Sequence, residues 1–455
     1  MLTLVLESFG PFASRYEVEI KPLTLIIGRN SVGKSMLAHL VWALSVATPA
    51  FNTLFKVFDE KGGRRYIQEL IKSLEDREPV RAKEALEGAL LLLAEKALPQ
   101  ALAQSLKELL PKVYGRRLGR IVTGGHKRAI IEVKSWLGGG FRFVIDAEKE
   151  AISAEIVEHL IESIRCTIER LVNIDEERGA LIIGGETWFA ERIRTIADVY
   201  SELPTLLGLM MRSVFEPPVF ATRESAILLV DGRAGVLRTL LRPFTAMLSE
   251  ALFPDQEFIA YYYMLAERLA DSMDSLKAAK SFMRELGFDL ELRMEAGVYN
   301  VYAKMWSGEV VPVALAPSGI RESVALVVAL TAPNTPSLVV VEEPEAHLHP
   351  RAQVLLAELM ARAVASGRKW VVATTHSDYI VYELNNQVIA SSTRGSGGLG
   401  PDKVAAYLVR REGGEAVIET IGVGPEGIPE EEFARVAEEL ATRRGFLVLR
   451  GQEEG

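Results

Sequence analysis

The fold of this chain is decided by residues 28–35, which read Gly28-Arg29-Asn30-Ser31-Val32-Gly33-Lys34-Ser35. This stretch fits the pattern G-x-x-x-x-G-K-[ST] without a mismatch. The preceding residues 23–27 form an apolar run typical of a buried strand, and residues 35–44 have helical spacing. In such a strand–loop–helix unit the glycines let backbone N–H groups point inward, and the helix N-terminus adds partial positive charge. The stretch therefore predicts a phosphate-binding loop.

Every residue of this loop is expected to lie against the phosphates of a nucleotide. Lys34 would reach the β- and γ-phosphates, and the Ser35 hydroxyl would be a ligand of Mg²⁺. The alternative is a chance glycine-rich turn. The strand-like residues before the loop and the helical residues after it disfavour that alternative.

An apolar run that ends in two acids supplies the second half of such a site, Ser337-Leu338-Val339-Val340-Val341-Glu342-Glu343. It predicts a strand buried on both faces that delivers its acids at the carboxyl end of a parallel sheet. Glu342 would hold Mg²⁺ through a water, and Glu343 would polarise the attacking water as general base. The alternative is an exposed acidic loop. Two acids after an apolar run are costly to bury unless a metal or a cleft receives them.

The remaining patterns predict an α/β fold. Helix, strand, helix and strand alternate through residues 321–374, which is typical of a parallel sheet. Helical periodicity predominates over residues 51–213, with predicted helices at 151–172 and 188–211, and it returns at 236–286. Predicted hairpins pair 129–134 with 141–146, 290–294 with 298–305, and 404–410 with 415–420.

These patterns divide the chain into segments. The expected boundaries are an N-terminal lobe with the phosphate-binding loop at 1–50, a mostly helical insertion with a small hairpin at 51–213, a strand of the main sheet at 214–230, a helical segment at 231–287, a C-terminal lobe with the acid pair at 288–430, and a C-terminal helix and tail at 431–455. The last helix would begin at Pro429, because proline is favoured in the first turn.

Composition limits the class of protein. Of the 455 residues, 49% are hydrophobic and 25% are charged, which is normal for a folded globular chain. No apolar run approaches the ~20 residues of a membrane span, and the N-terminus lacks signal-peptide features, so we expect a cytoplasmic protein without a membrane partner. The single cysteine, Cys166, excludes an internal disulfide and is expected to be a small core residue. Asn and Gln are scarce, with seven of each, which suggests adaptation to heat.

Two further stretches carry a family resemblance. Glu342-Glu343-Pro344-Glu345-Ala346-His347-Leu348-His349-Pro350, followed by Ala373-Thr374-Thr375-His376-Ser377, resembles the OLD-like (overcoming-lysogenization-defect) ABC ATPases. The opening Leu6-Glu7-Ser8-Phe9-Gly10-Pro11-Phe12 is similar to that group and to RecF and SMC heads. The resemblance implies an ABC-type P-loop ATPase head, with a mixed sheet, an antiparallel β subdomain and a large helical insertion. ATP and Mg²⁺ are the implied cofactors.

The same resemblance implies a site shared between two subunits. Ala316-Pro317-Ser318-Gly319-Ile320-Arg321-Glu322-Ser323 lies where such heads carry a signature helix. Ser318 and Gly319 of one subunit would then cap the γ-phosphate bound to the loop of the other in a homodimer. The alternative is an ordinary helix start, since only the Ser-Gly core of the usual signature is present.

The resemblance also assigns smaller roles. His376 matches the switch histidine that senses the γ-phosphate, and Arg223 would lie near the nucleotide. His347 and His349 raise the alternative of a metal site with Glu343 and Glu345, but the resemblance places them in a stretch that crosses the dimer interface. Two departures are plain. No Asp-x-Asp pair follows His376, so a Toprim nuclease domain is not expected, and no Cys-x-x-Cys zinc hook occurs.

A basic segment interrupts an acidic chain. The net charge is −9, yet residues 112–128 contain no acid and carry Lys112, Arg116, Arg117, Arg120, Lys127 and Arg128. Such a block suits nucleic-acid phosphates, although a solvated basic face is equally compatible with it.

Three functions are therefore open. The first is a nucleotide-dependent dimer that acts as a conformational switch in DNA-linked processes, either genome maintenance or anti-phage defence. The second is a regulatory ATPase that acts on a protein partner without nucleic acid. The third, the ATPase subunit of a transporter, is disfavoured because a full Leu-Ser-Gly-Gly-Gln signature is missing. The residues do not distinguish ATP from GTP.

Overall fold

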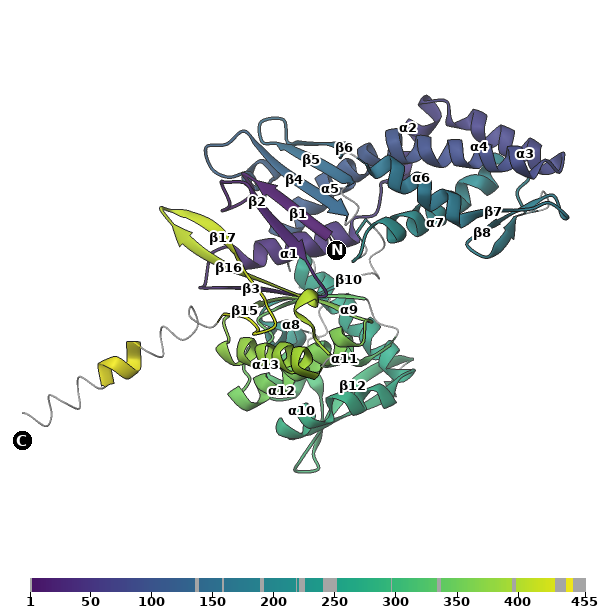
Figure 1. Ribbon diagram of the computed structural model, residues 1–455. Helices are drawn as coiled ribbons and strands as arrows, with labels where there is room; N and C mark the ends of the chain where they lie inside the picture. The colour runs from purple at the N-terminus through teal and green to yellow at the C-terminus, as the bar shows by residue number, and fades with distance from the viewer. Residues whose placement is uncertain are drawn as a thin grey trace, which may run out of the picture.

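The computed structural model describes most of the chain as regular elements (Figure 1). The described residues are 2–135, 139–157, 159–188, 192–217, 219–220, 226–239, 252–295, 297–333, 337–394, 398–429 and 439–444. Pro218 and Ala221 of the predicted strand, Arg223 and most of the predicted C-terminal helix lie outside them. Residues 219–220 are described and do not form a strand.

A six-stranded sheet forms the centre of the molecule, in the order β10-β14-β15-β3-β16-β17. The first five strands are parallel, and β17 returns antiparallel to β16. Their bounds are β10 Ala226–Leu229, β14 Leu338–Glu342, β15 Trp370–Thr375, β3 Leu23–Gly28, β16 Val404–Glu412 and β17 Glu415–Ile421. The residues of β10 and β14 are all buried, as expected for strands covered on both faces. The strands predicted at 23–27, 337–341, 370–374 and 404–420 are confirmed.

Helices cover this sheet. The helix that follows β3, α1 (Lys34–Val46), packs along β3, β10, β14 and β15. The other side carries α11 (Ser318–Thr331), α12 (Pro350–Ala365) and α13 (Asp378–Arg394), which appear below the sheet in Figure 1. The strands that carry the predicted loop and the predicted acids are thus buried between two layers of helices. The predictions for α11 and α12 are confirmed.

A second sheet joins segments that are far apart in the chain. Its antiparallel order is β2-β1-β4-β5-β6, and β1 pairs with β4 so that Leu6 lies opposite Ile131. The bounds are β2 Tyr16–Ile20, β1 Leu2–Glu7, β4 Arg128–Ser135, β5 Gly140–Asp146 and β6 Ala151–Val157. Residues of the N-terminal segment and of the segment predicted as an insertion therefore share one sheet.

The helix predicted over 151–172 is wrong in its first half. Residues Ala151–Val157 pair with β5 as β6, and the helix α6 begins only at Leu160. Hydrogen bonding to the edge of the existing sheet prevails over helix propensity here, because tertiary pairing outweighs a weak local preference. The prediction that Cys166 is a core residue is also wrong, because it lies on the exposed side of α6. Trp188, predicted in a helix, ends a small sheet instead.

The helical part projects from the rest of the molecule, at the upper right of Figure 1. Pro99 lies in the first turn of α5, a position where proline is tolerated. The elements of this part are α2 Phe51–Glu60, α3 Gly63–Glu75, α4 Pro79–Leu92, a π-helical turn Leu93–Ala97, α5 Leu98–Tyr114, α6 Leu160–Leu171 and α7 Ile196–Val214, with the strands β7 Val172–Asp175, β8 Ala180–Ile183 and β9 Glu186–Trp188.

The residues between β10 and α11 form a third unit, in the lower part of Figure 1. The hairpin predicted at 290–305 is confirmed as β11 and β12, with β13 beside β12. The bounds are α8 Arg233–Thr239, α9 Phe253–Ala270, a 3₁₀ helix Met273–Ala279, α10 Lys280–Glu285, β11 Phe288–Glu295, β12 Val298–Met305 and β13 Val310–Pro312.

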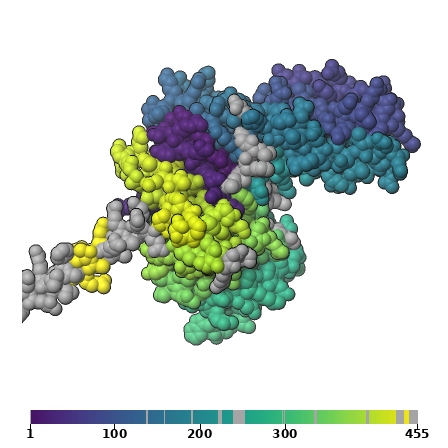
Figure 2. Space-filling view, viewed as in Figure 1, coloured from purple at the N-terminus to yellow at the C-terminus, as the bar shows by residue number. Residues whose placement is uncertain are grey.

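The C-terminal hairpin packs against the N-terminal strands, and Figure 2 shows the yellow and purple surfaces side by side. The hydroxyl of Tyr407 accepts from the Glu19 N–H at 2.7 Å, and the Tyr16 hydroxyl donates to the Ala416 carbonyl at 3.3 Å. Among the described residues no single helix has the length and hydrophobicity of a membrane span, although α1 and α2 together, across a 57° bend, pass by length and composition.

Candidate functional site

The loop of residues 28–35 connects β3 to α1, as the sequence predicts. Gly28 has φ 147°, and a Cβ there would lie 2.0 Å from the Val409 carbonyl oxygen of the neighbouring strand. Gly33 has φ 105°, and its Cβ would lie 2.6 Å from Pro11 Cγ. Both positions therefore require glycine, because of their backbone angles and because of close packing.

Lys34 is nearly buried at the start of α1, with 5% of its surface exposed. Its Nζ donates to the Arg29 carbonyl at 2.9 Å, which bends the side chain back over the loop. Nζ also lies 3.1 Å from Nε2 of His376. Burial lowers the pKa of Lys34, while the charges of Glu343, Glu345 and Glu342 act in the opposite direction.

Glu342, the last residue of β14, reaches the first turns of α1. Its Oε2 lies 3.0 Å from His39 Nε2 and accepts from the Asp231 N–H at 3.2 Å. Burial alone would raise the pKa of Glu342. The contacts with His39, the Ser35 hydroxyl and the Asp231 amide outweigh it and lower the pKa to about 2. The two residues expected to hold Mg²⁺, Ser35 and Glu342, are thus in contact. His39 was not singled out from the sequence, although it lies one helical turn after Ser35 on the same face.

Glu343 and His376 meet across adjacent strand ends. Glu343 Oε1 lies 2.8 Å from His376 Nε2, and both side chains are about one-third exposed (35% and 27%). The Glu343 N–H donates to the Thr374 carbonyl at 3.0 Å, which holds the residue in the left-handed region at φ 42°. The predicted base and the predicted switch histidine are therefore in direct contact, with Lys34 beside them.

Glu345 lies beside Glu343 and His376 and accepts hydrogen bonds from residues 375 and 376. The sequence did not suggest this role. Its Oε1 accepts from the His376 N–H at 2.6 Å and from the Thr375 hydroxyl at 2.8 Å. Burial raises the pKa of Glu345, against these hydrogen bonds. The position of Glu345 shortly after the acid pair could have indicated this contact, because the turn after β14 brings the chain back toward β15.

Arg233 is fully buried and contacts the backbone of the acid pair. Its guanidinium donates to the carbonyl oxygens of Val230 at 2.8 Å, Glu342 at 2.7 Å and Glu322 at 2.9 Å. It also forms an ion pair with Glu322 Oε2 at 3.2 Å. One side chain thus links β10, the end of β14 and the helix α11. No local pattern in the sequence identifies this role, because its partners are about 90 to 110 residues away.

Ser318 and Gly319 begin α11, with Pro317 before them and no side-chain cap. A Cβ on Gly319 would lie 3.0 Å from the His347 carbonyl oxygen, so the helix start packs closely against the turn after the acids. In the part of the chain that the structure describes, no hydrogen bond joins Ser318 to residues 28–35 of the same chain. Leu315, just before this helix, is 58% exposed.

The two histidines after the acids have separate surroundings. His349 Nδ1 accepts from the Arg351 N–H at 3.3 Å and caps α12. His347 is exposed with φ 58°. Over the described ranges, no group of three or more His, Cys, Asp or Glu residues could hold a metal ion.

The basic segment is partly paired. Lys127 contacts Glu148 at 3.0 Å, and Arg128 contacts Asp146 at 3.5 Å. Arg116, Arg117 and Arg120 are exposed.

Comparison with known proteins agrees with this geometry. A family model described as "AAA domain, putative AbiEii toxin, Type IV TA system" matches residues 228–381, which hold the acid pair, the start of α11 and His376 but not the loop at 28–35. No curated protein matches the chain.

Solved structures of SMC heads are similar in arrangement at low identity. An SMC head bound to the C-winged helix domain of ScpA has 11% identity, covers 92% of this chain and 97% of its own, and has a TM-score of 0.46. The SMC head domain from Thermotoga maritima has 10% identity, covers 92% and 98%, and has a TM-score of 0.36. The Smc head with an extended coiled coil bound to the C-terminal domain of ScpA, from Pyrococcus furiosus, has 10% identity, covers 97% and 100%, and has a TM-score of 0.44. At these scores the likeness carries no argument about function.

The chain's own topology agrees with the expected class. A phosphate-binding loop follows β3, the acid pair follows β14, β15 lies between these strands, and an antiparallel sheet stands alongside. The fold is therefore α/β, with a mostly parallel sheet, an antiparallel sheet beside it and a large, mostly helical addition, which is the architecture expected for an ABC-type P-loop head.

Proposed function

We propose that this protein binds ATP with Mg²⁺, hydrolyses it to ADP and phosphate, and works in the cytoplasm as a nucleotide-dependent dimer. The observation that carries the proposal is that two side chains meet at His376 Nε2. Lys34 Nζ lies 3.1 Å from it and Glu343 Oε1 lies 2.8 Å from it. The stability of the fold does not require a buried lysine, a histidine and an acid to meet beside a phosphate-binding loop. Each has a role in phosphoryl transfer.

The loop would bind the phosphates through its backbone and through Lys34. The N–H groups of residues 28–35 would donate to phosphate oxygens, and the loop leads into the start of α1, where the helix dipole favours an anion. Lys34 Nζ would exchange the Arg29 carbonyl for oxygens of the β- and γ-phosphates. Because Lys34 is buried, that contact would be stronger than one in water.

The oxygen atoms of Ser35 and Glu342 fit Mg²⁺, which prefers hard oxygen ligands and keeps several waters. With its pKa lowered to about 2, the Glu342 carboxylate is ionised at neutral pH. Mg²⁺ would neutralise charge on the β- and γ-phosphates. His39 and the Asp231 amide hold the carboxylate in place.

Glu343 would act as general base. Its carboxylate takes a proton from the attacking water as the water oxygen bonds to the γ-phosphorus and the bond to the bridging oxygen breaks. ADP and phosphate leave. His376 Nε2 lies 2.8 Å from Glu343 Oε1 and 3.1 Å from Lys34 Nζ. Binding of a γ-phosphate at Lys34 would therefore change the position of the base through His376.

Ser318 and Gly319 would complete the site of a partner subunit. The start of α11 is the N-terminus of a helix, which suits an anion. Within one chain it makes no hydrogen bond to the loop among the described residues, and the apolar Leu315 beside it is exposed. These observations support two ATP sites built between two copies of the chain.

The effector would be DNA, in genome maintenance or anti-phage defence. The exposed Arg116, Arg117 and Arg120 support contact with phosphates. The description of the matching family as a putative toxin of a type IV system favours defence. A regulatory ATPase that acts on a protein partner is the alternative.

Phosphate release from Mg-ATP tests the proposal, with and without double-stranded DNA. The wild-type protein should hydrolyse ATP and Glu343→Gln should not. The control Glu415→Gln, at an exposed position of β17, should match the wild type. Turnover by Glu343→Gln at the wild-type rate contradicts the assignment of the base. An ATPase rate unchanged by DNA favours the protein-partner alternative.

A further inference from the structure

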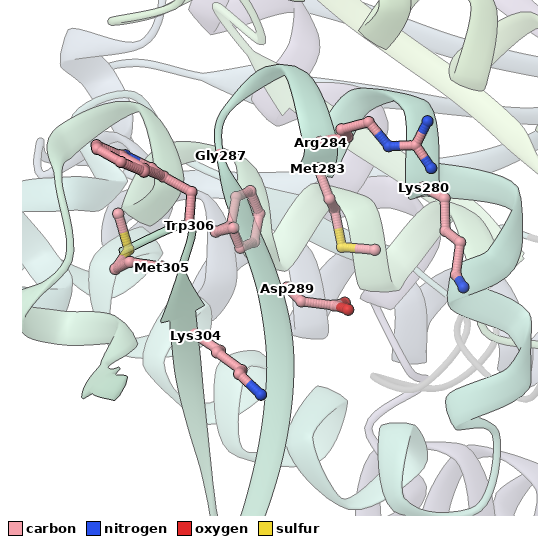
Figure 3. A pocket seen from close by; sticks show the side chains of 9 residues that line it. Lys280, Met283, Arg284, Gly287, Asp289, Lys304, Met305 and Trp306 are labelled. Carbon is pink, nitrogen blue, oxygen red and sulfur yellow. The ribbon is translucent and has the colours of Figure 1, made fainter. Parts of the chain in front are cut away.

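A hollow of about 380 Å³ lies in the third unit, between α10 and the β11–β12 hairpin. It shares no residue with the ATP site. Figure 3 shows Trp306 and Met305 on one side, Arg284 and Lys280 on the other, and Asp289 and Lys304 below. The volume is in the range of small-ligand sites.

Trp306 forms an exposed aromatic wall of this hollow. It is 86% exposed, whereas Trp42 and Trp188 are buried. The backbone N–H of Trp306 donates to the Gly287 carbonyl at 2.8 Å, and a Cβ on Gly287 (φ 71°) would lie 2.9 Å from Trp306 Cδ1. Glycine at 287 therefore leaves room for the indole beside the backbone, with most of its surface in solvent. An exposed indole of this kind favours a stacking partner.

The hollow is also positively charged. Lys280, Arg284 and Lys304 line it, against one acid, Asp289. Lys304 is 3.8 Å from Glu291, and in the described part of the chain no ion pair is found for Lys280 or Arg284. Asp274, which is near Lys280 in the chain, pairs with Lys277 at 2.8 Å. In a chain of net charge −9 this excess of cations is local.

We propose that the hollow binds one nucleotide unit, with its base stacked on Trp306 and its phosphate held by Lys280, Arg284 and Lys304. The unit comes either from single-stranded nucleic acid or from a free mononucleotide. An acidic peptide would use the cations but has no need of a flat aromatic face, so the exposed indole favours the base. This site goes beyond the proposed ATPase and requires neither ATP nor the P-loop.

The test uses the full chain without ATP or Mg²⁺ and three probes: a fluorescein-labelled thymidine oligonucleotide of about 12 residues, dTMP, and a polyglutamate peptide. Anisotropy of the labelled strand gives its affinity, and tryptophan emission reports stacking. dTMP has no β-phosphate, so it is a poor ligand for the loop at residues 28–35. We expect the oligonucleotide to bind and to quench the emission. Quenching by dTMP as well supports the free nucleotide as a source, and quenching by the oligonucleotide alone supports the strand.

Variants separate stacking from charge. Trp306→Leu should weaken binding of the oligonucleotide about ten-fold without changing its salt dependence. The double variant Lys280→Gln/Arg284→Gln should reduce the slope of log affinity against log salt by at most about 0.7, the contribution of one phosphate contact on a single strand. Gly287→Ala, which displaces the indole and leaves every charge in place, should resemble Trp306→Leu. The control Lys56→Gln/Lys72→Gln removes two exposed cations of the helical part and should have no effect.

The proposal is overturned if Trp306→Leu binds the oligonucleotide like the wild type, or if only polyglutamate binds and loses affinity in the Lys280→Gln/Arg284→Gln variant. Each variant of the hollow should keep wild-type ATPase activity. Failure of the ATPase assay in the wild type, with oligonucleotide binding intact, refutes the proposed function and leaves this site standing.

Discussion

Arg233 and Glu322 form a buried ion pair, with 3.2 Å between Nε and Oε2 and only 1% of each side chain exposed. Glu322 Oε1 also accepts from the Ala234 N–H at 2.9 Å, and the guanidinium contacts the carbonyl of Glu342. The pair therefore joins the helix that begins with the predicted signature to the strand that ends in the acid pair. A shift of α11 on dimerisation would act on the position of Glu342 through this contact.

Loss of one partner of this pair should be strongly destabilising. Arg233→Met leaves the Glu322 charge buried and removes the donor to five carbonyl groups, so we expect the free energy of unfolding to fall by about 3–5 kcal/mol. Urea denaturation measures it. The double variant Arg233→Met/Glu322→Gln should lose less than the sum of the single variants. Additive losses would mean that the two side chains do not interact.

Replacement of Lys34 should abolish tight nucleotide binding. Lys34→Ala removes the side-chain cation expected on the β- and γ-phosphates, and we expect the ATP affinity to fall by about 10- to 100-fold. Titration with a fluorescent ATP analogue measures this, with Lys56→Ala as the control at an exposed position. Unchanged affinity in Lys34→Ala would remove the assignment of the loop.

The acid and the histidine should affect turnover rather than binding. Glu343→Gln keeps the hydrogen bond to His376 but loses the base, so hydrolysis should fall by about 10²- to 10⁴-fold while ATP binding persists. The variant should accumulate as a dimer with ATP and Mg²⁺, seen by size-exclusion chromatography. His376→Ala should also slow turnover. A loss of ATP affinity as large as that of Lys34→Ala would instead make His376 a binding residue.

Acid should remove the stabilising contribution of Glu342. Its pKa falls from the usual 4.5 to about 2 in the folded state, so its ionised form stabilises the fold above pH 4.5 and loses that effect as the pH falls toward 2. The shift corresponds to about 3 kcal/mol. Without nucleotide, Glu342→Gln should therefore show a smaller decrease in unfolding free energy between pH 7 and pH 3 than the wild type. Equal decreases would show that the contacts with His39 and Ser35 do not hold the charge.

The composite site can be tested with mixed dimers. Ser318→Arg places a bulky cation at the start of α11, so it should block dimerisation and hydrolysis and leave nucleotide binding by one chain nearly intact. A mixture of Ser318→Arg and Lys34→Ala proteins can form dimers with one site whose loop and signature are both intact. ATPase activity in the mixture, absent from either variant alone, would show that sites are shared. Normal hydrolysis by monomeric Ser318→Arg would replace the ABC-type mechanism with a self-contained site.

Local patterns in the sequence were enough to locate the main parts of the site. The loop at residues 28–35 is specified by glycine spacing and by the strand and helix on either side of it. The strand ending at Glu342 is specified by a continuous apolar run, and the hairpins by alternation and glycine turns. These signals depend on neighbouring residues, and the backbone conformation they favour is the one observed.

The tertiary structure alone decided what the local patterns leave open. Residues Ala151–Val157 have helical spacing but complete a sheet edge, because β5 offers unpaired backbone groups there. His39 meets Glu342, and Arg233 meets Glu322, across 303 and 89 residues of chain. Residues so far apart leave no periodic pattern in the sequence. A buried charge is stable only where the fold places its partner beside it, so these pairings depend on the tertiary structure. The sequence by itself therefore predicted the candidate phosphate-binding and catalytic residues, and the packing of distant elements determined which charged groups contact them.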